Sequence, residues 1–280
     1  MLCHRRFTPK EALEEVRHLQ ALNHGHVVRL VGSYAQGKHF SVLTYPVAEC
    51  DLKAFLAQIE RRGYPFHSRK GLAKGISCLS AAIEHIHAAG VKHMDLKPQN
   101  ILVEDSNCPS VFKHPRFYIT DFGISRFVQD LEASETDGFS QRTLMYCSPE
   151  VAAEQPRGRS SDIFSLGCVF AEMLTCMACR SQAEFRSYRA DDGETFHKNL
   201  PQVVEWIDDL PADYVGIVHL LAAKKMTELE PQELENTEII AIKRMLQQEP
   251  KDRPTAADLV KSFPPWFCCS SGSEPFVRVA

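Results

Sequence analysis

The stretch that most constrains this chain is the polar octapeptide at residues 93–100, His-Met-Asp-Leu-Lys-Pro-Gln-Asn, which leads into the apolar run 101–103. A second polar motif, Asp-Phe-Gly at residues 121–123, follows the next predicted strand, in 111–120. An Asp-Phe-Gly tripeptide alone is a common turn. Two polar motifs in this order, separated by a loop and a hairpin, are far more specific, because such a hairpin brings both motifs to one end of a strand pair.

The two motifs resemble the H-R-D-x-K-x-x-N catalytic loop and the D-F-G motif of eukaryotic protein kinases. With a lysine two residues after the aspartate, the loop resembles that of the serine/threonine kinases rather than that of the tyrosine kinases. The resemblance implies transfer of the γ-phosphate of ATP to a Ser or Thr hydroxyl of a protein substrate, with ATP and Mg²⁺ as cofactors. In such a reaction the protein mainly positions groups and offsets charge.

The resemblance gives each polar position a role. Asp95 would accept the proton of the attacking hydroxyl, and Lys97 would lie against the transferring phosphoryl group. Asn100 and Asp121 would hold Mg²⁺, which prefers oxygen ligands. Supporting roles within the two motifs fall to His93, Phe122 and Gly123, of which His93 would brace the second motif.

Upstream residues resemble part of a kinase small lobe. A helix is predicted from Thr8, its N-cap, to about residue 22, with Glu11 completing a capping box. Two strand-like runs follow at 27–34 and 40–45. By resemblance, Glu15 takes the place of the glutamate that pairs with the active-site lysine, Leu43 is the gatekeeper and 44–47 form the hinge. The positions that would contact the nucleotide are Leu43, Thr44, Tyr45, Val47, Asp51, Lys97, Asn100, Leu102 and Asp121.

Downstream motifs resemble a kinase large lobe. Helices are predicted from Asp51 onward and over 69–89, where Gly90 ends the second one. Residues 142–150 resemble the segment that receives the substrate and ends in A/S-P-E, with Thr143 hydrogen-bonding Asp95 and Lys97. Residues 161–167, which include Asp162, resemble the start of the central helix. An Asp-Arg-Pro motif supplies Arg253, expected to form a buried bidentate ion pair with Glu150.

We therefore expect an α+β, protein-kinase-like fold. At 280 residues and 31.6 kDa the chain can bury a large core or two lobes. Residues 1–46 are predicted to form a partial small lobe of one helix, two strands and the hinge. Residues 47–267 would form a complete, mainly helical large lobe, and 268–280 a flexible tail.

Composition excludes some classes of protein. The net charge of −4 gives no reason to expect nucleic-acid binding. No run of eighteen apolar residues is present, so no transmembrane segment is expected. The N-terminus has no secretory pattern, so we expect an intracellular protein, cytoplasmic or nuclear, whose ten cysteines are reduced.

The chain departs from the family at its start. No G-x-G-x-x-G occurs, and neither Lys10 nor Lys38 lies on a strand where the active-site lysine belongs. Losing one charge-stabilising donor costs about 10²–10³ in rate. An N-terminally incomplete kinase copy with impaired activity is favoured, because the large-lobe positions are all present. The alternative is a pseudokinase or scaffold whose missing strands a partner could replace; the DNA upstream of Met1 would decide between them.

A second departure is Met94, where most kinases have arginine. Methionine cannot bind a phosphate, so we expect weak dependence on phosphorylation of the activation segment, whose candidate sites are Ser134, Thr136 and Ser140. A small-molecule phosphotransferase would share the catalytic loop, but Ser148-Pro149-Glu150 and Arg253 argue for a protein substrate.

Other features have ordinary interpretations. Cys176 and Cys179 lack a second pair for a zinc site. Cys268-Cys269 lacks a second membrane signal. The acidic stretch 228–238 is expected to be a solvated face or insert before a helix over 239–246. Four histidines are expected to be packing or surface residues: His24, His26, His85 and His87.

Overall fold

The computed structural model describes residues 2–3, 22–36, 39–104, 114–121, 144–211 and 231–263. Several predicted features lie outside these ranges: most of the helix expected over 8–22 with Glu15, the candidate phosphorylation sites, Lys38, the 268–280 tail, and the site residues Phe122, Gly123 and Thr143.

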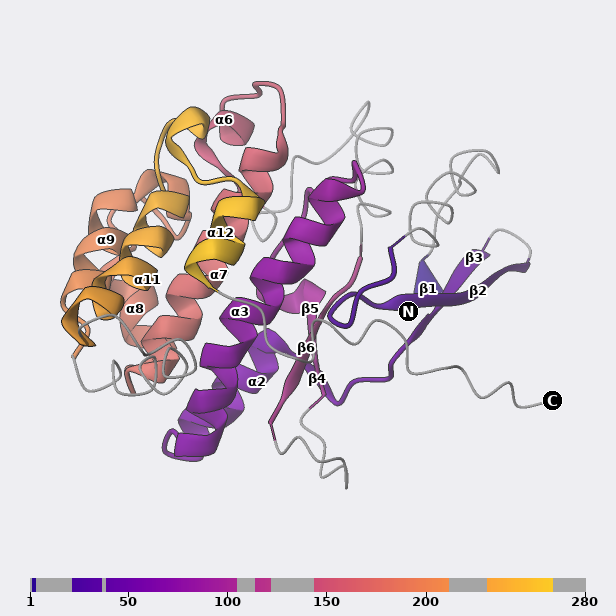
Figure 1. The fold of residues 1–280 in the computed structure, drawn as a ribbon, viewed down its shortest axis with the longest axis horizontal. Helices are drawn as coiled ribbons and strands as arrows, with labels where there is room; N and C mark the ends of the chain where they lie inside the picture. The colour runs from indigo at the N-terminus through magenta and orange to yellow at the C-terminus, as the bar shows by residue number, and fades with distance from the viewer. Residues whose placement is uncertain are drawn as a thin grey trace.

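The smaller part of the molecule is an antiparallel sheet beside the helices (Figure 1). Its strands are β1 (Leu2–Cys3), β2 (Arg29–Gln36) and β3 (His39–Tyr45), in the order β1-β3-β2. The expected two strands were therefore one too few. The outer edge of β3 pairs with β1, Leu2 opposite Ser41, because an open strand edge offers unpaired N–H and C=O groups. The sequence did not predict β1, because a strand of two residues is too short to show an alternating apolar and polar pattern.

The segment before β2 joins this sheet to the rest of the protein. The prediction that a strand begins at residue 27 was wrong, because Val27 and Val28 pair elsewhere. Val27 forms a parallel bridge with Ile119, and the Val28 amide donates to the Ile119 carbonyl at 3.0 Å. The Ile119 amide donates in turn to the His26 carbonyl at 2.9 Å. The small sheet is thus hydrogen-bonded to the strand that leads to Asp121.

A second small sheet has the order β4-β5-β6, from β4 (Cys50–Asp51), β5 (Ile101–Glu104) and β6 (Arg116–Ile119). In the β5–β6 pair Ile101 lies opposite Ile119, and the Thr120 amide donates to the Asn100 carbonyl at 3.0 Å. This antiparallel register places Asn100, just before β5, beside the residues that follow β6. The hairpin therefore brings the two polar motifs together.

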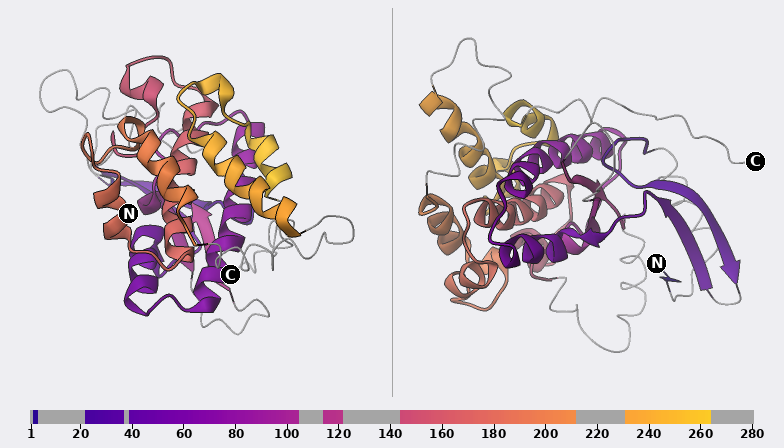
Figure 2. Two further views of the ribbon diagram at one scale, coloured as in Figure 1. Left: turned by 90° about the vertical axis from the view of Figure 1, so that its left-hand side faces the viewer. Right: turned by 90° about the horizontal axis from the view of Figure 1, so that it is seen from below.

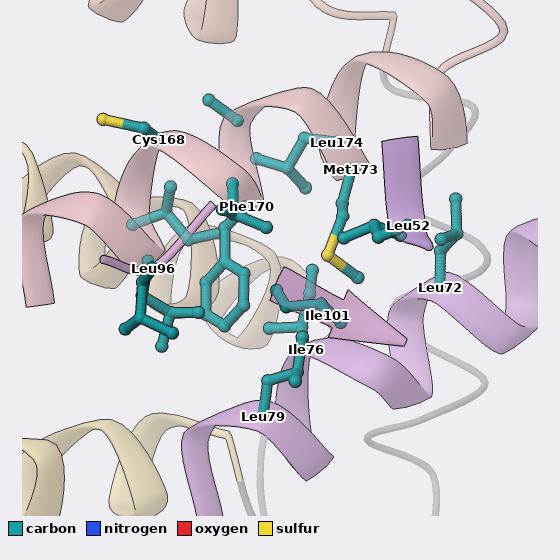
Figure 3. Packing of buried hydrophobic residues seen from close by; sticks show 14 of the residues in the cluster. Leu52, Leu72, Ile76, Leu79, Leu96, Ile101, Cys168, Phe170, Met173 and Leu174 are labelled. Atoms are coloured by element: carbon teal, nitrogen blue, oxygen red, sulfur yellow. The ribbon is translucent and has the colours of Figure 1, made fainter. Parts of the chain in front are cut away.

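Helices α2 (Leu52–Arg61), α3 (Phe66–Ala88) and α7 (Arg159–Met177) form the centre of the larger part (Figure 2). Their buried side chains belong to one cluster with those of β5 and of residues 93–100, and Figure 3 shows Leu52, Ile76, Met173, Ile101 and Leu96 among them. By length and composition α7 could cross a membrane, but 83% of its apolar window is buried within the protein, as is usual for a core helix.

Shorter helices surround this centre, and α12 begins after its N-cap Thr255, which forms a capping box with Asp258. The helix expected over 239–246 begins earlier, at Pro231, so most of the acidic stretch 228–238 belongs to α11. The remaining helices are η1 (Pro98–Asn100), α6 (Pro149–Ala152), α8 (Gln182–Tyr188), η2 (Phe196–Lys198), α9 (Leu200–Asp208), α11 (Pro231–Met245), η4 (Pro250–Asp252) and α12 (Ala256–Ser262).

Candidate active site

A buried carboxylate at the start of α7 holds the backbone of the catalytic loop. Asp162 Oδ2 accepts from the His93 amide at 2.9 Å, and Oδ1 accepts from the Met94 amide at 2.7 Å. Met94 has φ = 69°, a left-handed conformation that costs free energy for a residue with a bulky side chain. Two charge-assisted hydrogen bonds at this point stabilise the strained turn, so Asp162 sets the path of the loop into Asp95.

The same carboxylate has a third partner that the sequence did not reveal. His87, near the end of α3, places Nε2 3.0 Å from Asp162 Oδ2, and both side chains are buried. His87 was expected to be a packing or surface residue; it is buried, as a packing residue would be, but the expectation did not include its contact with Asp162. A histidine at helical spacing carries no local signal of a partner that is distant in sequence.

His93 connects the catalytic loop to the strand before Asp121. Its Nε2 lies 2.8 Å from the Thr120 carbonyl, and its Nδ1 lies 3.3 Å from the Asp95 amide. A carbonyl only accepts and an amide only donates, so this network assigns the proton to Nε2. Complete burial lowers the pKa of His93, although the Asp162 charge opposes the shift. The ring is therefore a neutral brace between the two motifs.

Donors from two side chains converge on Asp95. Lys97 Nζ donates to Asp95 Oδ2 at 2.7 Å, and Asn100 Nδ2 donates to the same oxygen at 3.1 Å and to the Asp95 carbonyl at 2.8 Å. The backbone N–H of Asn100 also donates to the Lys97 carbonyl at 2.9 Å. Within the described part of the chain, both side-chain donors hydrogen-bond to Asp95 Oδ2. Asp95 Oδ1 is therefore left to accept a proton from outside the loop.

Asp121 follows β6 with φ = 60°, a conformation that aspartate tolerates better than most residues. Burial raises the pKa of its carboxyl, and repulsion from Asp95 adds to the shift, while His93 and Lys97 oppose it. A partly buried pair of carboxylates is costly unless a cation lies nearby. This charge arrangement favours a cation at the place where β5 begins and β6 ends.

The donor set fits Mg²⁺ bound together with a polyphosphate. Asn100 Nδ2 donates its hydrogen bonds to Asp95, so Asn100 Oδ1 is left to serve as an oxygen ligand together with the Asp121 carboxylate. Among the described residues no group of three or more His, Cys, Asp or Glu could hold a metal alone. Mg²⁺ commonly takes one or two protein oxygens and completes its shell with water and phosphate, so Asn100 and Asp121 would suffice.

Four of the residues predicted to contact a nucleotide lie at the end of β3 or just after it: Leu43, Thr44, Tyr45 and Val47. Leu43, Tyr45 and Val47 are exposed, Val47 by 85% of its surface. Large apolar side chains exposed together are typical of a binding surface. Leu102 on β5 is half-buried and pairs with Asp51. The Asp51 side chain is occupied as the N-cap of α2, accepting from the Ala54 amide at 2.7 Å.

The end of the predicted substrate segment is fixed by the expected ion pair. Arg253 Nη1 and Nη2 each donate to one oxygen of Glu150 at 2.8 Å. Ser161 Oγ donates to Glu150 Oε1 at 2.8 Å. Burial raises the pKa of Glu150, but the Arg253 and Ser161 hydrogen bonds outweigh it, so the pKa lies below its usual value. The remaining Arg253 donors reach the carbonyls of Ser160, Gln247 and Gln248.

A family model for the protein kinase domain matches residues 3–267 of the chain. The chain belongs to the protein kinase family. It is 30% identical over 269 residues to Cell division control protein 2 homolog 3 of Trypanosoma brucei brucei, which covers 92% of this chain and 78% of that protein. It is 25% identical over 252 residues to Mitogen-activated protein kinase kinase kinase 2 of Arabidopsis thaliana, covering 90% of this chain and 32% of that one.

A third relative is Calcium/calmodulin-dependent protein kinase type 1 of Macrobrachium nipponense, 31% identical over 168 residues, or 60% of this chain and 44% of the relative. The kinase domain thus spans most of the first relative and less than half of the other two. These relatives place it among the serine/threonine protein kinases, which confirms the branch predicted from Lys97.

Proposed function

We propose that this kinase domain transfers the γ-phosphate of ATP to a Ser or Thr hydroxyl of a protein substrate. The observation that carries the proposal is the convergence of Lys97 and Asn100 on one oxygen of Asp95. Asp121 lies at the end of the neighbouring strand, tied to the loop through His93 and Thr120. One base, one cation and two oxygen ligands in one place are the parts that phosphoryl transfer needs.

The residues divide the work by their chemistry. Asp95 accepts the proton of the attacking hydroxyl on Oδ1 while Lys97 and Asn100 hold its Oδ2 in place. The Lys97 ammonium, which is 20% exposed, also offsets negative charge that reaches the site from the phosphates. Bound Mg²⁺ supplies further charge neutralisation, with Asn100 Oδ1 and Asp121 as its protein ligands. The roles of Phe122, Gly123 and Thr143 remain predictions, because these residues lie outside the described ranges.

The nucleotide's base would lie on the exposed apolar surface of Leu43, Tyr45 and Val47, and the backbone of 44–47 would hydrogen-bond its edge. This assignment divides the chain near residue 46 into a small lobe, a large lobe to 267 and a tail. Leu102, on β5 just after the catalytic loop, would approach the base from the large lobe.

A protein substrate is favoured over a small molecule by the segment that ends in Glu150. This segment is anchored to α7 by Ser161 and to the C-terminal region by Arg253, through contacts that lie outside the catalytic loop. A small-molecule phosphotransferase does not need such a platform. Five hydrogen bonds from one arginine, all to buried or partly buried acceptors, indicate that the position of this segment matters.

A pseudokinase is the second candidate, and one observation favours it. The sequence contains no G-x-G-x-x-G phosphate loop, and among the described residues no strand of the small sheet carries a lysine. From a typical kinase turnover of about 1–100 s⁻¹, loss of such donors at about 10²–10³ each predicts slow transfer by these residues alone. We favour a slow kinase, because Asp95, Lys97, Asn100 and Asp121 are arranged for chemistry that a scaffold does not perform.

The test compares the 280-residue protein with its Asp95→Asn variant, using γ-labelled ATP and a generic basic protein as phosphate acceptor. Asp191→Asn, at an exposed aspartate far along the chain, is the matched control. We expect slow Mg²⁺-dependent labelling of Ser or Thr that Asp95→Asn abolishes and the control retains. Labelling that survives in Asp95→Asn would refute the role given to Asp95, and Mg·ATP binding without any transfer would favour the pseudokinase.

A further inference from the structure

A fully buried arginine lies beneath the segment that is proposed to receive the substrate. Arg189 follows α8 and is 1% exposed, yet it belongs to none of the motifs. Its guanidinium donates to the Glu194 carbonyl, and its Nε–H has no hydrogen-bond partner among the described residues. Burying a guanidinium without complete hydrogen bonding is costly. Its presence therefore calls for a compensating interaction.

The first compensation is an aromatic ring that contacts the substrate segment. The Arg189 Cζ atom lies 4.0 Å from the ring centroid of Phe196 in η2, within the range of a cation–π interaction. The Phe196 amide donates to the Met145 carbonyl at 3.0 Å, and its ring packs against Tyr146 at 5.5 Å. The arginine thus holds Phe196, whose backbone amide hydrogen-bonds Met145 and whose ring packs against Tyr146.

A second interaction involves Glu172 of α7, a half-buried residue whose carboxylate contacts Tyr146. The Tyr146 hydroxyl donates to Glu172 Oε1 at 2.8 Å, while Ser165 Oγ on α7 donates to the Tyr146 carbonyl at 2.8 Å. Burial raises the pKa of Glu172, and the Tyr146 hydrogen bond and the positive charge of Arg189 work against that shift. Phe196, which Arg189 holds, and Glu172 therefore both contact Tyr146.

We propose that Arg189 is a positioning residue for the substrate segment 144–148, holding it through Phe196 and by balancing the charge of Glu172. The proposal rests on the function proposed above only where it concerns substrate affinity. Its consequence is that Arg189 governs the Michaelis constant for the protein substrate without touching substrate, ATP or the catalytic loop. An arginine that merely filled the core would affect all parts of the domain alike.

The test uses hydrogen exchange and four variants. Two backbone hydrogen bonds report on the segment: Cys147 amide to Leu144 carbonyl at 3.2 Å, and Phe196 amide to Met145 carbonyl at 3.0 Å. Arg189→Met removes the cation, and Arg186→Met is the control at an exposed arginine of α8, the helix that Arg189 follows. Glu172→Gln alone and combined with Arg189→Met removes the opposing charge while keeping an acceptor for Tyr146.

We expect the Cys147 and Phe196 amides to exchange at least about tenfold faster in Arg189→Met, because removing one of two compensating buried charges leaves the other uncompensated. Amides in the middle of α7 should be unchanged, and Arg186→Met should match the wild type. The double variant should exchange more slowly than Arg189→Met at both amides, since it lacks the uncompensated carboxylate.

Unchanged exchange at both amides in Arg189→Met, or an equal rise throughout α7, would overturn the proposal. So would a double variant that exchanges as fast as Arg189→Met. With an active domain, we also expect at least about a tenfold higher KM for a peptide substrate in Arg189→Met and an unchanged KM for ATP. If the wild type transfers no phosphate, the proposed function fails while the exchange measurement still decides the role of Arg189.

Discussion

Replacement of Arg253 by methionine tests the most deeply buried arginine–glutamate ion pair in the described part of the chain. The Arg253 side chain is fully buried and Glu150 almost so, and the two are joined by two hydrogen bonds of 2.8 Å. Breaking a buried pair by removing one partner costs about 3–5 kcal/mol, because the other charge stays buried. For a domain of this size that corresponds to a fall in Tm of about 6–20 °C.

The size of the loss can be divided with a second variant. Arg253 also donates to three backbone carbonyls, which would lose their partner in any apolar replacement. Arg253→Met combined with Glu150→Gln should therefore recover only the part due to the uncompensated carboxylate, about 1–3 kcal/mol relative to Arg253→Met at pH 7. Arg253→Lys should lie between the wild type and Arg253→Met, because lysine cannot make the bidentate contact.

The pH dependence gives an independent check. The pKa of Glu150 is lowered in the folded protein, so the pair contributes its full stability above the ordinary glutamate pKa. That contribution is lost as the pH falls through the folded value. Thermal and urea unfolding between pH 7 and pH 3 should therefore show the difference between wild type and Arg253→Met shrinking in acid. A loss below about 1 kcal/mol at pH 7, or a difference that grows in acid, would refute this account of the pair.

Three further perturbations test other parts of the account. Gly71→Ala would place a Cβ 2.3 Å from Pro115 Cγ, so we expect a loss of about 1–3 kcal/mol in urea unfolding, whereas Gly32→Ala, with open space at its Cβ, should lose much less. Asp162→Asn should destabilise the left-handed turn at Met94 by about 1.5–3 kcal/mol per lost charge-assisted bond, seen as faster amide exchange in the catalytic loop; unchanged exchange would contradict that role. Because Met94 cannot bind phosphate, the activity should change by less than about threefold when three residues become alanine together: Ser134, Thr136 and Ser140. A large loss of activity in this triple variant would show that the activation segment acts through another cation.

Patterns within the sequence predicted the parts of the structure that depend on local signals or on paired motifs. Thr255 is the N-cap of α12 and forms a capping box with Asp258, a signal that spans four residues of sequence. The pair Glu150–Arg253 joins residues far apart in the chain, and it was expected because the segments around both residues resemble protein-kinase motifs. The hairpin that joins Asn100 to Asp121 followed from two short apolar runs, each adjoining a polar motif.

Other features were missed because tertiary contacts decide them. β1 is only two residues long and exists because β3 offers an open edge. Val27 and Val28 have strong strand propensity, yet they pair with Ile119 rather than extending β2. His87 and Arg189 gain their roles from partners on other helices, and neither lies in a recurring motif. Propensity and spacing do not report such contacts.

The central claim is that the catalytic loop and the residue after β6 meet around the terminal phosphate of a nucleotide. The most direct measurement is a crystal structure of the domain with Mg²⁺ and a non-hydrolysable ATP analogue. The account predicts a metal ion bound by Asn100 Oδ1 and Asp121, with the terminal phosphate beside Lys97 and facing Asp95. A nucleotide bound elsewhere, or a metal ion that contacts neither Asn100 nor Asp121, would contradict it.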